Sequence, residues 1–286
     1  MSQSAFSVNL SGKTAIVTGG SGVLCTCMCR ALATAGAHVV VLGRRPEPAV
    51  AVAADIVRAG GKATAMACDV LDKEGLQRVR DRVEAECGAI DILVNGAGGN
   101  HPRGTTSKEY LFPEDLLSGA EGVTTFFDLD PKGIEHVLDL NFVGTLLPTQ
   151  VFARPMALRG RGTVVNISSM SAYRPLTKIP AYSAAKAAVS NFTQWLAVHL
   201  SKVGIRVNAL APGFFLTEQN RALLTQPDGA LTPRGERILG HTPMGRFGRP
   251  DDLTGALLWL ASDEASGFVT GVVVPVDGGF GAFSGV

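Results

Sequence analysis

The sequence predicts an α/β fold in which a doubly wound sheet of seven parallel strands forms a single domain over residues 1–286. Short apolar runs alternate with stretches of helical period along the chain, which is typical of repeated β–α units. The apolar runs are unbroken, so both faces of the sheet should be buried, as in parallel sheets. A chain of 286 residues, 46% of them hydrophobic, is long enough to bury such a core.

The first half of the chain repeats the strand–helix unit three times before a fourth strand. The first strand runs into Thr18 and Gly19, a helix follows, and Gly36 ends that helix before the next apolar run. Glycine after a helical stretch is a common stop signal, and Gly60 and Gly61 repeat it. The expected strands are residues 13–18, 38–42, 63–67 and 90–94, and the expected helices are residues 23–35, 49–59 and 73–87.

The second half continues the alternation around two irregular segments. A long helix is expected over residues 132–158, with Pro148 and Pro155 marking irregularities because proline lacks the N–H group that a helix interior uses. Residues 99–130 and 214–249 show no clear apolar period and leave the carboxyl ends of strands, where doubly wound sheets bind ligands. We expect both segments to be extended substrate loops. The remaining strands are expected at residues 163–167, 205–210 and 272–276, and the remaining helices from Tyr182 to near Gly204 and over residues 251–261.

Composition and charge argue against several classes of function. The net charge of +1 gives no electrostatic reason to bind nucleic acid or a membrane surface. The N-terminus shows no pattern of a signal peptide, and no apolar run is long enough to span a bilayer. Five cysteines without a framework spacing favour reduced thiols in an intracellular, cytoplasmic protein. Cys25, Cys27 and Cys29 would point to diverging faces of a helix, so we expect packing residues and no metal site.

Three glycines follow the first strand where the first helix should begin. Gly19, Gly20 and Gly22 let the backbone turn tightly and approach a ligand closely. The N-terminus of the following helix offers free N–H groups and a partial positive charge, which suit a pyrophosphate. Because the turn lies after a strand and before a helix, it predicts a dinucleotide site.

Tyr182 and Lys186 form the pair that carries the predicted chemistry. The apolar residues around them recur near a 3.6-residue period, so the two side chains should share one face of a helix. A free phenol has a pKa near ~10, and a neighbouring ammonium lowers it towards a range useful for proton transfer. Taken alone, such a pair is more often part of a solvated helix face, so its interpretation depends on the rest of the chain.

Together these residues resemble the motif set of the short-chain dehydrogenase/reductase family over essentially the whole chain. Ser169, Tyr182 and Lys186 stand thirteen and four residues apart, which matches the catalytic spacing of that family. The resemblance implies a Rossmann-like fold and an NAD(P)-dependent oxidoreductase that interconverts a secondary alcohol and a ketone. The other matching residues are Thr18-Gly19, Asn95-Gly96-Ala97-Gly98, Asn141 and Pro212-Gly213 with Thr217.

The resemblance also implies a role for each matching residue. Tyr182 would be the general acid/base, Lys186 would lower its pKa and hold the nicotinamide ribose, and Ser169 would polarise the substrate oxygen. Asn141 would maintain the helix geometry and a water relay to Lys186, completing the catalytic set. The cofactor-binding residues would be Gly19, Ser21, Gly22, Val23, Leu24, Arg44, Arg45, Asp69, Val70, Asn95, Ala97, Gly98, Tyr182, Lys186, Pro212, Gly213, Phe215 and Thr217.

Departures from the usual family pattern indicate a subgroup. Val23 and Cys25 stand where the family usually has glycine, Asn95-Gly96 replaces the commoner double asparagine, and the loop after Gly98 is longer than usual. These features resemble the D-mannonate oxidoreductases of the short-chain type, also called fructuronate reductases. The implied substrate is a sugar acid. Another polyol, a gluconate-type acid, a carrier-bound ketone or a non-catalytic cofactor-binding regulatory role remain alternatives.

The end of the second strand favours NADP(H) as cofactor. Gly43 stands where NAD-dependent relatives often carry an aspartate that binds the ribose 2′-hydroxyl, and Arg44 and Arg45 follow it. Arginine can receive a 2′-phosphate, although it can also stack on adenine, so NAD(H) stays the alternative.

The substrate loops should supply the groups that bind the acid. A buried carboxylate needs charged or strong hydrogen-bond donors, and Lys186 is committed to Tyr182 and the ribose. The candidates are Asn100, His101, Arg103, Arg174 and Lys178, with the two arginines first because a guanidinium binds a carboxylate through two bonds. The helices expected over residues 132–158 and 181–203 are apolar over wide faces, which predicts a homo-oligomer, either a tetramer or a dimer.

Overall fold

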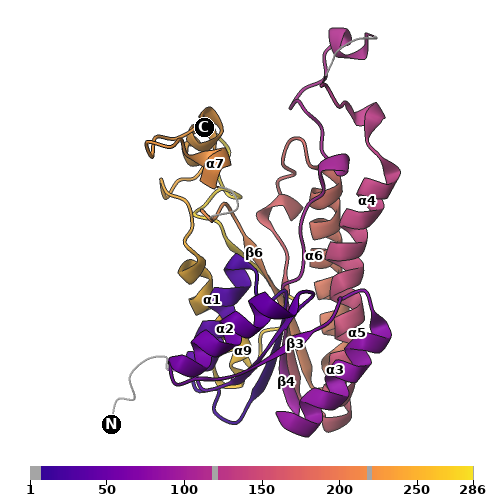
Figure 1. The fold of residues 1–286 in the computed structure, drawn as a ribbon, viewed down its shortest axis with the longest axis vertical. Coiled ribbons are helices and arrows are strands. Elements are labelled where there is room, and N and C mark those ends of the chain that lie inside the picture. Colours follow the sequence, from indigo (N-terminus) through magenta and orange to yellow (C-terminus); the bar gives the residue numbers. More distant parts are fainter. Residues whose placement is uncertain (1–7, 118–121, 218–220, 286) are drawn as a thin grey trace.

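The computed structural model describes residues 8–117, 122–217 and 221–285. Seven parallel strands form one sheet in the order β3-β2-β1-β4-β5-β6-β7, and helices flank it in a single Rossmann-like α/β domain (Figure 1). The predicted doubly wound fold is confirmed. The strands are β1 (Thr14–Thr18), β2 (His38–Gly43), β3 (Lys62–Ala67), β4 (Ile90–Asn95), β5 (Gly162–Ile167), β6 (Ile205–Pro212) and β7 (Val273–Val276).

Two groups of helices cover the two faces of the sheet. One face carries α1 (Val23–Thr34), α2 (Pro46–Arg58) and α9 (Thr254–Ala261), and the other carries α3 (Lys73–Glu86), α5 (Gly144–Arg159) and α6 (Pro180–Leu200). Successive strand residues point to opposite faces, so Ala15 and Val17 contact the first group and Ile16 contacts the second. All three are fully buried, which explains the unbroken apolar run.

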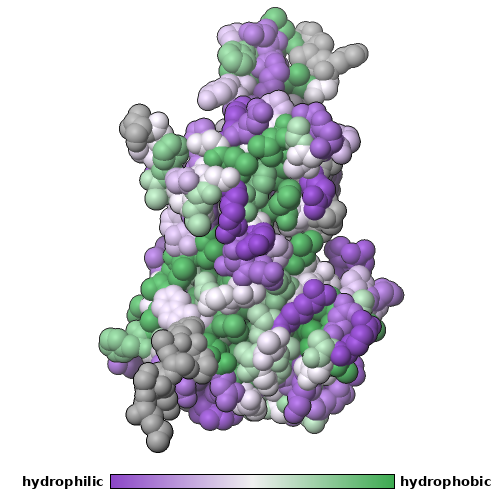
Figure 2. Space-filling model, turned by 90° about the vertical axis from the view of Figure 1, so that its left-hand side faces the viewer, coloured by the Kyte–Doolittle hydropathy of each residue, from purple (hydrophilic) through white to green (hydrophobic). Residues whose placement is uncertain are grey.

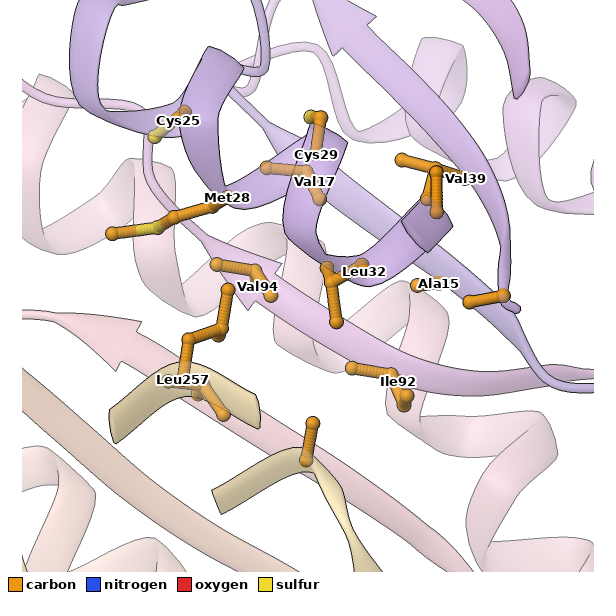
Figure 3. Packing of buried hydrophobic residues seen from close by; sticks show 14 of the residues in the cluster. Ala15, Val17, Cys25, Met28, Cys29, Leu32, Val39, Ile92, Val94 and Leu257 are labelled. Atoms are coloured by element: carbon orange, nitrogen blue, oxygen red, sulfur yellow. The ribbon is translucent and has the colours of Figure 1, made fainter. Parts of the chain in front are cut away.

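Helix α1 packs Cys25 and Cys29 into the core on the first face. Figure 3 shows Cys25, Met28 and Cys29 among the apolar side chains of the sheet. Burial raises the pKa of the Cys25 thiol to about 11, so it keeps its proton at neutral pH. Cys27 is only partly buried, and its Sγ lies 2.7 Å from Oδ1 of Asp251. All five cysteines are free thiols.

The helix expected over residues 132–158 is interrupted at a different place from the one predicted. It consists of α4 (Pro131–Leu138), a π-helical turn (Asp139–Val143) and α5. Pro148 and Pro155, where irregularity was expected, lie inside α5. The irregular turn instead surrounds Asn141, whose Nδ2 donates to the carbonyl of Val137 four residues earlier at 2.7 Å. A side chain that competes for a backbone acceptor in this way disturbs the regular helical pattern.

The described part of the segment 99–130, residues 99–117 and 122–130, forms an extension at one end of the molecule. It contains three short 3₁₀ turns (Pro102–Gly104, Pro113–Leu116 and Phe126–Asp128), and its stem is held where Ser107 N–H donates to the carbonyl of Thr124. Figure 1 shows this extension rising above α4. In Figure 2 the same projection carries hydrophobic residues beside hydrophilic ones.

The second irregular segment is more regular than predicted. It contains α7 (Arg221–Leu224) and α8 (Pro233–Gly240), and the Thr232 hydroxyl caps α8 by accepting from Gly235 N–H at 3.1 Å. An ion pair joins this side of the molecule to the extension, because Arg237 of α8 reaches both carboxylate oxygens of Glu109 at 2.9 and 3.1 Å.

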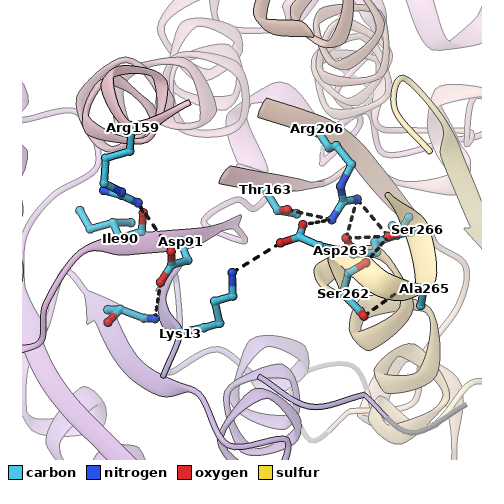
Figure 4. Close-up of polar contacts among 12 residues, drawn as sticks. Lys13, Ile90, Asp91, Arg159, Thr163, Arg206, Ser262, Asp263, Ala265 and Ser266 are labelled. Carbon is cyan, nitrogen blue, oxygen red and sulfur yellow. Dashed lines mark hydrogen bonds and ion pairs between the residues drawn. The ribbon is translucent and has the colours of Figure 1, made fainter. Parts of the chain in front are cut away.

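A polar network fixes the amino ends of the strands. Asp91 accepts from Thr14 N–H at 3.0 Å and faces Arg159 at 3.6 Å. Arg206 bonds Asp263 of α10 (Asp263–Ser266) at 3.0 Å (Figure 4). These contacts lie at the amino ends of the strands, away from the carboxyl ends where ligands bind. They therefore stabilise the fold and do not form part of a ligand site. Across the described ranges, no helix has the length and apolarity needed to cross a bilayer.

Candidate active site

A cavity of about 870 Å³ lies along the carboxyl ends of the strands. The turns and loops that follow β1 to β6, together with α4 and α6, line it, as expected for a doubly wound sheet. Most of the predicted cofactor residues border it. They are Gly19, Ser21, Gly22, Val23, Leu24, Arg44, Arg45, Asp69, Val70, Ala97, Gly98, Tyr182, Lys186, Pro212, Gly213, Phe215 and Thr217.

The glycine turn brings the ends of β1 and β4 into backbone contact. Gly19 has a φ of 63°, and a Cβ there would lie 2.9 Å from the backbone of Ala97, so a larger side chain would be strained. The Thr18 hydroxyl accepts from Gly96 N–H at 3.1 Å and from Ala97 N–H at 3.2 Å. Gly22 then begins α1 without a side-chain cap, and the first turn of α1 holds no acidic residue.

The uncapped N-terminus of α1 therefore faces the cavity with free N–H groups. Such an end favours an anion through its hydrogen bonds and its partial positive charge. At the β2 end, Arg44 and Arg45 are exposed on the cavity rim. The residues present thus fit a ligand with a pyrophosphate and a further negative or polar group near β2.

Ser169 and Tyr182 lie at the β5 and α6 side of the cavity. Ser169 follows β5, and its Oγ accepts from Ser171 N–H at 3.2 Å. Tyr182 lies in the first turn of α6, with its ring partly buried against Val137, Ala181 and Ala185. The Ser169 side chain also acts on the phenol, where it lowers the pKa of Tyr182. These contacts bring together two residues that are thirteen positions apart in the sequence.

Lys186 is buried beside this pair. Its Nζ donates to the carbonyl of Ile167 at 2.8 Å and lies 5.7 Å from the centre of the Tyr182 ring. Burial lowers the pKa of Lys186 to about 8, because desolvation penalises the charged ammonium.

The expectation that Lys186 lowers the pKa of Tyr182 is wrong for the structure described here. Burial raises the pKa of the phenol above its usual value, and the polar side chain of Ser169 opposes the rise only in part. The physical reason is that desolvation acts on both partners, which favours the neutral phenol and the neutral amine together.

Asn141 lies behind the site and does not border the cavity. Its side chain is fully buried, donates to the carbonyls of Gly99 and Val137 at 2.7 Å each, and accepts from Gly99 N–H at 3.2 Å. A Cβ at Gly98 would lie 2.7 Å from Asn141 Oδ1 and 3.1 Å from Lys186 Nζ. Gly98 therefore has no space for a side chain between these two groups.

Asn95 does not border the cavity either, although the sequence predicts it among the cofactor residues. It is 1% exposed, and its Nδ2 donates to Thr149 Oγ1 at 2.8 Å and to Asn166 Oδ1 at 2.9 Å. Asn166 in turn donates to Thr193 of α6 at 2.9 Å. Asn95 thus joins α5 to α6 along one face of the sheet through buried hydrogen bonds.

None of the five predicted substrate residues borders the cavity. Arg103 pairs with Asp130 at 2.7 Å, and Arg174 donates from Nε to the carbonyl of Gly281 at 3.1 Å. Asn100 donates to Thr105 at 3.0 Å. His101 accepts from Arg103 N–H, and Lys178 adopts a positive φ of 72°. Local partners hold most of these side chains, which sequence spacing alone cannot show.

His136 is an ionisable residue of the cavity wall that the sequence did not predict. It lies on α4 and borders the cavity together with Leu140, one helical turn further on. The sequence carried one usable signal, since His136 and Leu140 are four residues apart and therefore share a face. In the described part of the chain, no group of three or more histidine, cysteine or acidic residues is arranged to hold a metal ion.

Comparison with known proteins identifies the family to which this chain belongs. A sequence model of the family described as short chain dehydrogenase matches residues 13–228, which is more than half of the chain. The chain is therefore a member of the short-chain dehydrogenase family. It is an NAD(P)-dependent oxidoreductase that acts on CH–OH groups of a small-molecule substrate.

Individual members of this family are similar to the chain over almost its whole length. An uncharacterized oxidoreductase of Bacillus subtilis is 52% identical over 97% of this chain and 98% of its own length. A solved structure from Haemophilus influenzae, described as a proposed D-mannonate oxidoreductase with bound NAD, is 52% identical with a TM-score of 0.92 and covers 98% of both chains. A gluconate 5-dehydrogenase from Burkholderia cenocepacia in complex with NADP and tartrate is 33% identical with a TM-score of 0.79, covering 96% of this chain and 97% of its own.

Proposed function

We propose that this enzyme interconverts a secondary alcohol and a ketone in a sugar acid of the D-mannonate/D-fructuronate type. The observation that carries the proposal is the grouping of Ser169, Tyr182 and Lys186 at one end of a cavity that also contains a glycine turn and a free helix N-terminus. The similarity to the Haemophilus structure described as a D-mannonate oxidoreductase supports this substrate class. The motif departures around Cys25 and Gly96 point to the same subgroup.

The predicted cofactor residues would hold the dinucleotide along the cavity. The α1 N-terminus and the turn at Gly19 would bind the pyrophosphate, Asp69 and Val70 the adenine, and Pro212 and Thr217 the nicotinamide amide. When bound, the reduced nicotinamide supplies the hydride that reduces the ketone carbon.

The side chains of the protein supply the proton that the ketone oxygen takes up. During reduction the Tyr182 hydroxyl donates its proton to the ketone oxygen as negative charge develops there, and the Ser169 hydroxyl hydrogen-bonds the same oxygen. A pKa of Tyr182 held high by burial keeps the phenol protonated and ready for this step. Lys186 would bind the nicotinamide ribose, and Asn141 would maintain the helix geometry and a water relay that returns protons to Lys186.

We propose NADP(H) as the preferred cofactor, with NAD(H) as the alternative. Arg44 and Arg45 on the cavity rim offer two guanidinium groups to a ribose 2′-phosphate. At the place of the NAD-selecting aspartate stands Gly43, where a Cβ would lie 3.2 Å from Ser21 Oγ. The NAD in the 52% identical Haemophilus structure favours the alternative.

The proposal is tested by an activity panel with both cofactors. D-fructuronate, 5-keto-D-gluconate, D-fructose and a carrier-bound ketone would be reduced with NADPH and with NADH, and kcat/KM compared. We expect D-fructuronate with NADPH to give the largest value. A neutral or carrier-bound ketone as the best substrate would refute the sugar-acid assignment, and a larger kcat/KM with NADH would refute the cofactor assignment.

We also propose that the enzyme is a homo-oligomer. Leu158 on α5 and Trp195 and Val198 on α6 are large apolar residues exposed by 57% or more on the outer face of the molecule. Large apolar residues exposed on the outer faces of helices are usually covered by another subunit when they form a continuous surface.

A further inference from the structure

The proposed substrate needs a partner for its carboxylate, and the predicted cations are engaged elsewhere. Arg103 forms an ion pair with Asp130, and Arg174 donates a hydrogen bond to a backbone carbonyl near the C-terminus. Neither borders the cavity. Lys186 is buried and donates to Ile167. A sugar-acid carboxylate must therefore meet another donor on the wall beside Tyr182.

His136 occupies that wall. The next residue, Val137, packs with Ala181 and Ala185 against Tyr182, and the Val137 carbonyl accepts from Asn141. These contacts fix the last turn of α4 beside the first turn of α6. The exposed imidazole of His136 thus borders the same cavity as the phenol of Tyr182. Arg44 and Arg45 on the cavity rim follow β2, which is separated from β5 and Ser169 by β1 and β4 in the sheet order. They therefore lie at the opposite end of the cavity from Tyr182.

A second histidine, His101, packs against the His136 ring. The rings of His101 and His136 meet edge to face, with centroids 5.0 Å apart at 60°. His101 Nδ1 accepts from Arg103 N–H at 3.2 Å, which fixes that ring. Among the described residues, neither ring nitrogen of His136 has a hydrogen-bond partner. The imidazole is therefore oriented by packing while its N–H remains available to a ligand.

We propose that His136 binds the carboxylate of the sugar-acid substrate and so selects acids over neutral ketoses. The inference rests on the proposed function and assigns the specificity of the same site. An imidazole N–H can donate to a carboxylate whether the ring is neutral or charged. His101 acts as a positioning residue, because it touches His136 and does not border the cavity.

The test compares D-fructuronate with D-fructose, which has a hydroxymethyl group in place of the carboxylate. In H136L we expect KM for D-fructuronate to rise roughly 10- to 100-fold, because a hydrogen bond to a charged group is lost. We expect kcat and the kcat/KM for D-fructose to stay near the wild-type values. H136Q keeps an N–H donor and should restore part of the affinity. K132A, which removes an exposed cation from the same helix without touching the cavity, should leave KM unchanged.

The outcomes separate the two assignments. If the wild type reduces D-fructuronate and H136L keeps its KM, the role of His136 is overturned and the proposed function stands. If R103A raises this KM and H136L does not, Arg103 is the carboxylate partner instead. If the wild type reduces no sugar acid, the proposed function fails and the role of His136 falls with it. Isothermal titration with D-mannonate and D-mannitol gives a second readout: loss of acid binding alone in H136L supports the proposal, and equal binding contradicts it.

Discussion

At the scale of single residues, burial decides the charge state of the candidate catalytic pair. The spacing of Tyr182 and Lys186 predicts their proximity, and the structure places Lys186 Nζ 5.7 Å from the phenol ring. The sequence cannot show the direction of the pKa changes, because desolvation depends on the elements that cover the pair. Burial raises the pKa of Tyr182 and lowers that of Lys186 to about 8, so the phenol is neutral at pH 7 and the ammonium loses its proton only in mildly alkaline solution.

Tyr182→Phe should abolish turnover while leaving cofactor binding nearly intact. The ring keeps its packing against Val137 and Ala181, but the phenol that exchanges the proton is absent. Loss of a general acid/base typically costs on the order of 100-fold or more in rate. Steady-state kinetics and fluorescence titration with the reduced cofactor measure the two effects separately. Near-normal turnover in this variant would show that Tyr182 is not the acid/base.

Lys186 should make stability depend on alkaline pH. Its pKa is about 8 in the folded protein and ~10.4 in an unfolded polypeptide. Below pH 8 both states carry the proton, and the folded state bears the full cost of a buried ammonium. Between these pKa values the unfolded state binds more protons, so the free energy of unfolding rises with pH.

The variant Lys186→Met isolates this contribution. The unfolding free energy of the wild type minus that of the variant should rise by about 3 kcal/mol between pH 7 and pH 11. Loss of the bond to the Ile167 carbonyl adds only an offset that does not vary with pH. Urea unfolding of both proteins across this range provides the measurement, and a difference independent of pH would contradict the lowered pKa.

At the scale of secondary-structure elements, the turn after β4 controls the position of two predicted catalytic residues. A Cβ on Gly98 would meet Asn141 Oδ1 at 2.7 Å and Lys186 Nζ at 3.1 Å. Gly98→Ala should therefore displace one of them and lower kcat by on the order of 10- to 100-fold. Gly99→Ala is the matched control, because a Cβ there would meet only Leu140 at an ordinary 3.7 Å. Equal kcat values for the two variants would refute this role of the turn.

The strands and most helices could be predicted from apolar periodicity, with ends shifted by a few residues. Of the candidate site, the cofactor residues were predicted well and the substrate residues were not, and the difference has a physical reason. Residues fixed by backbone motifs, such as Gly19 and Thr217, fall on the cavity as expected. Loop side chains such as Arg103 do not, because their position depends on a partner, here Asp130, that spacing does not reveal. The same limit applies to Asn141, whose side-chain bonds place the irregular turn of the long helix.

At the scale of the whole molecule, large apolar side chains are exposed both on the outer faces of α5 and α6 and on the extension. The predicted sheet accounts for the inner faces of α5 and α6, which are packed on the strands. Their outer faces expose Leu158 and Val198 by 81% and 77%. The extension formed by residues 99–130 also exposes Leu117 by 69%, although sequence reasoning predicted only a substrate loop there. The two surfaces can be distinguished by substitution.

The outer face of α6 should form a subunit contact. Trp195 stacks between Phe192 and His199, with ring centroids 6.2 and 4.7 Å apart, and this stack presents a flat apolar surface beside Val198. Light scattering of the wild type should give a mass at least twice the 29.8 kDa of one subunit. The double substitution Trp195→Glu and Val198→Glu should lower that mass, because charges at an apolar contact are desolvated without partners. Leu117→Glu, which alters the extension alone, should leave it unchanged. A wild-type mass near that of one subunit would contradict the oligomer, and a lower mass only in Leu117→Glu would place the contact on the extension.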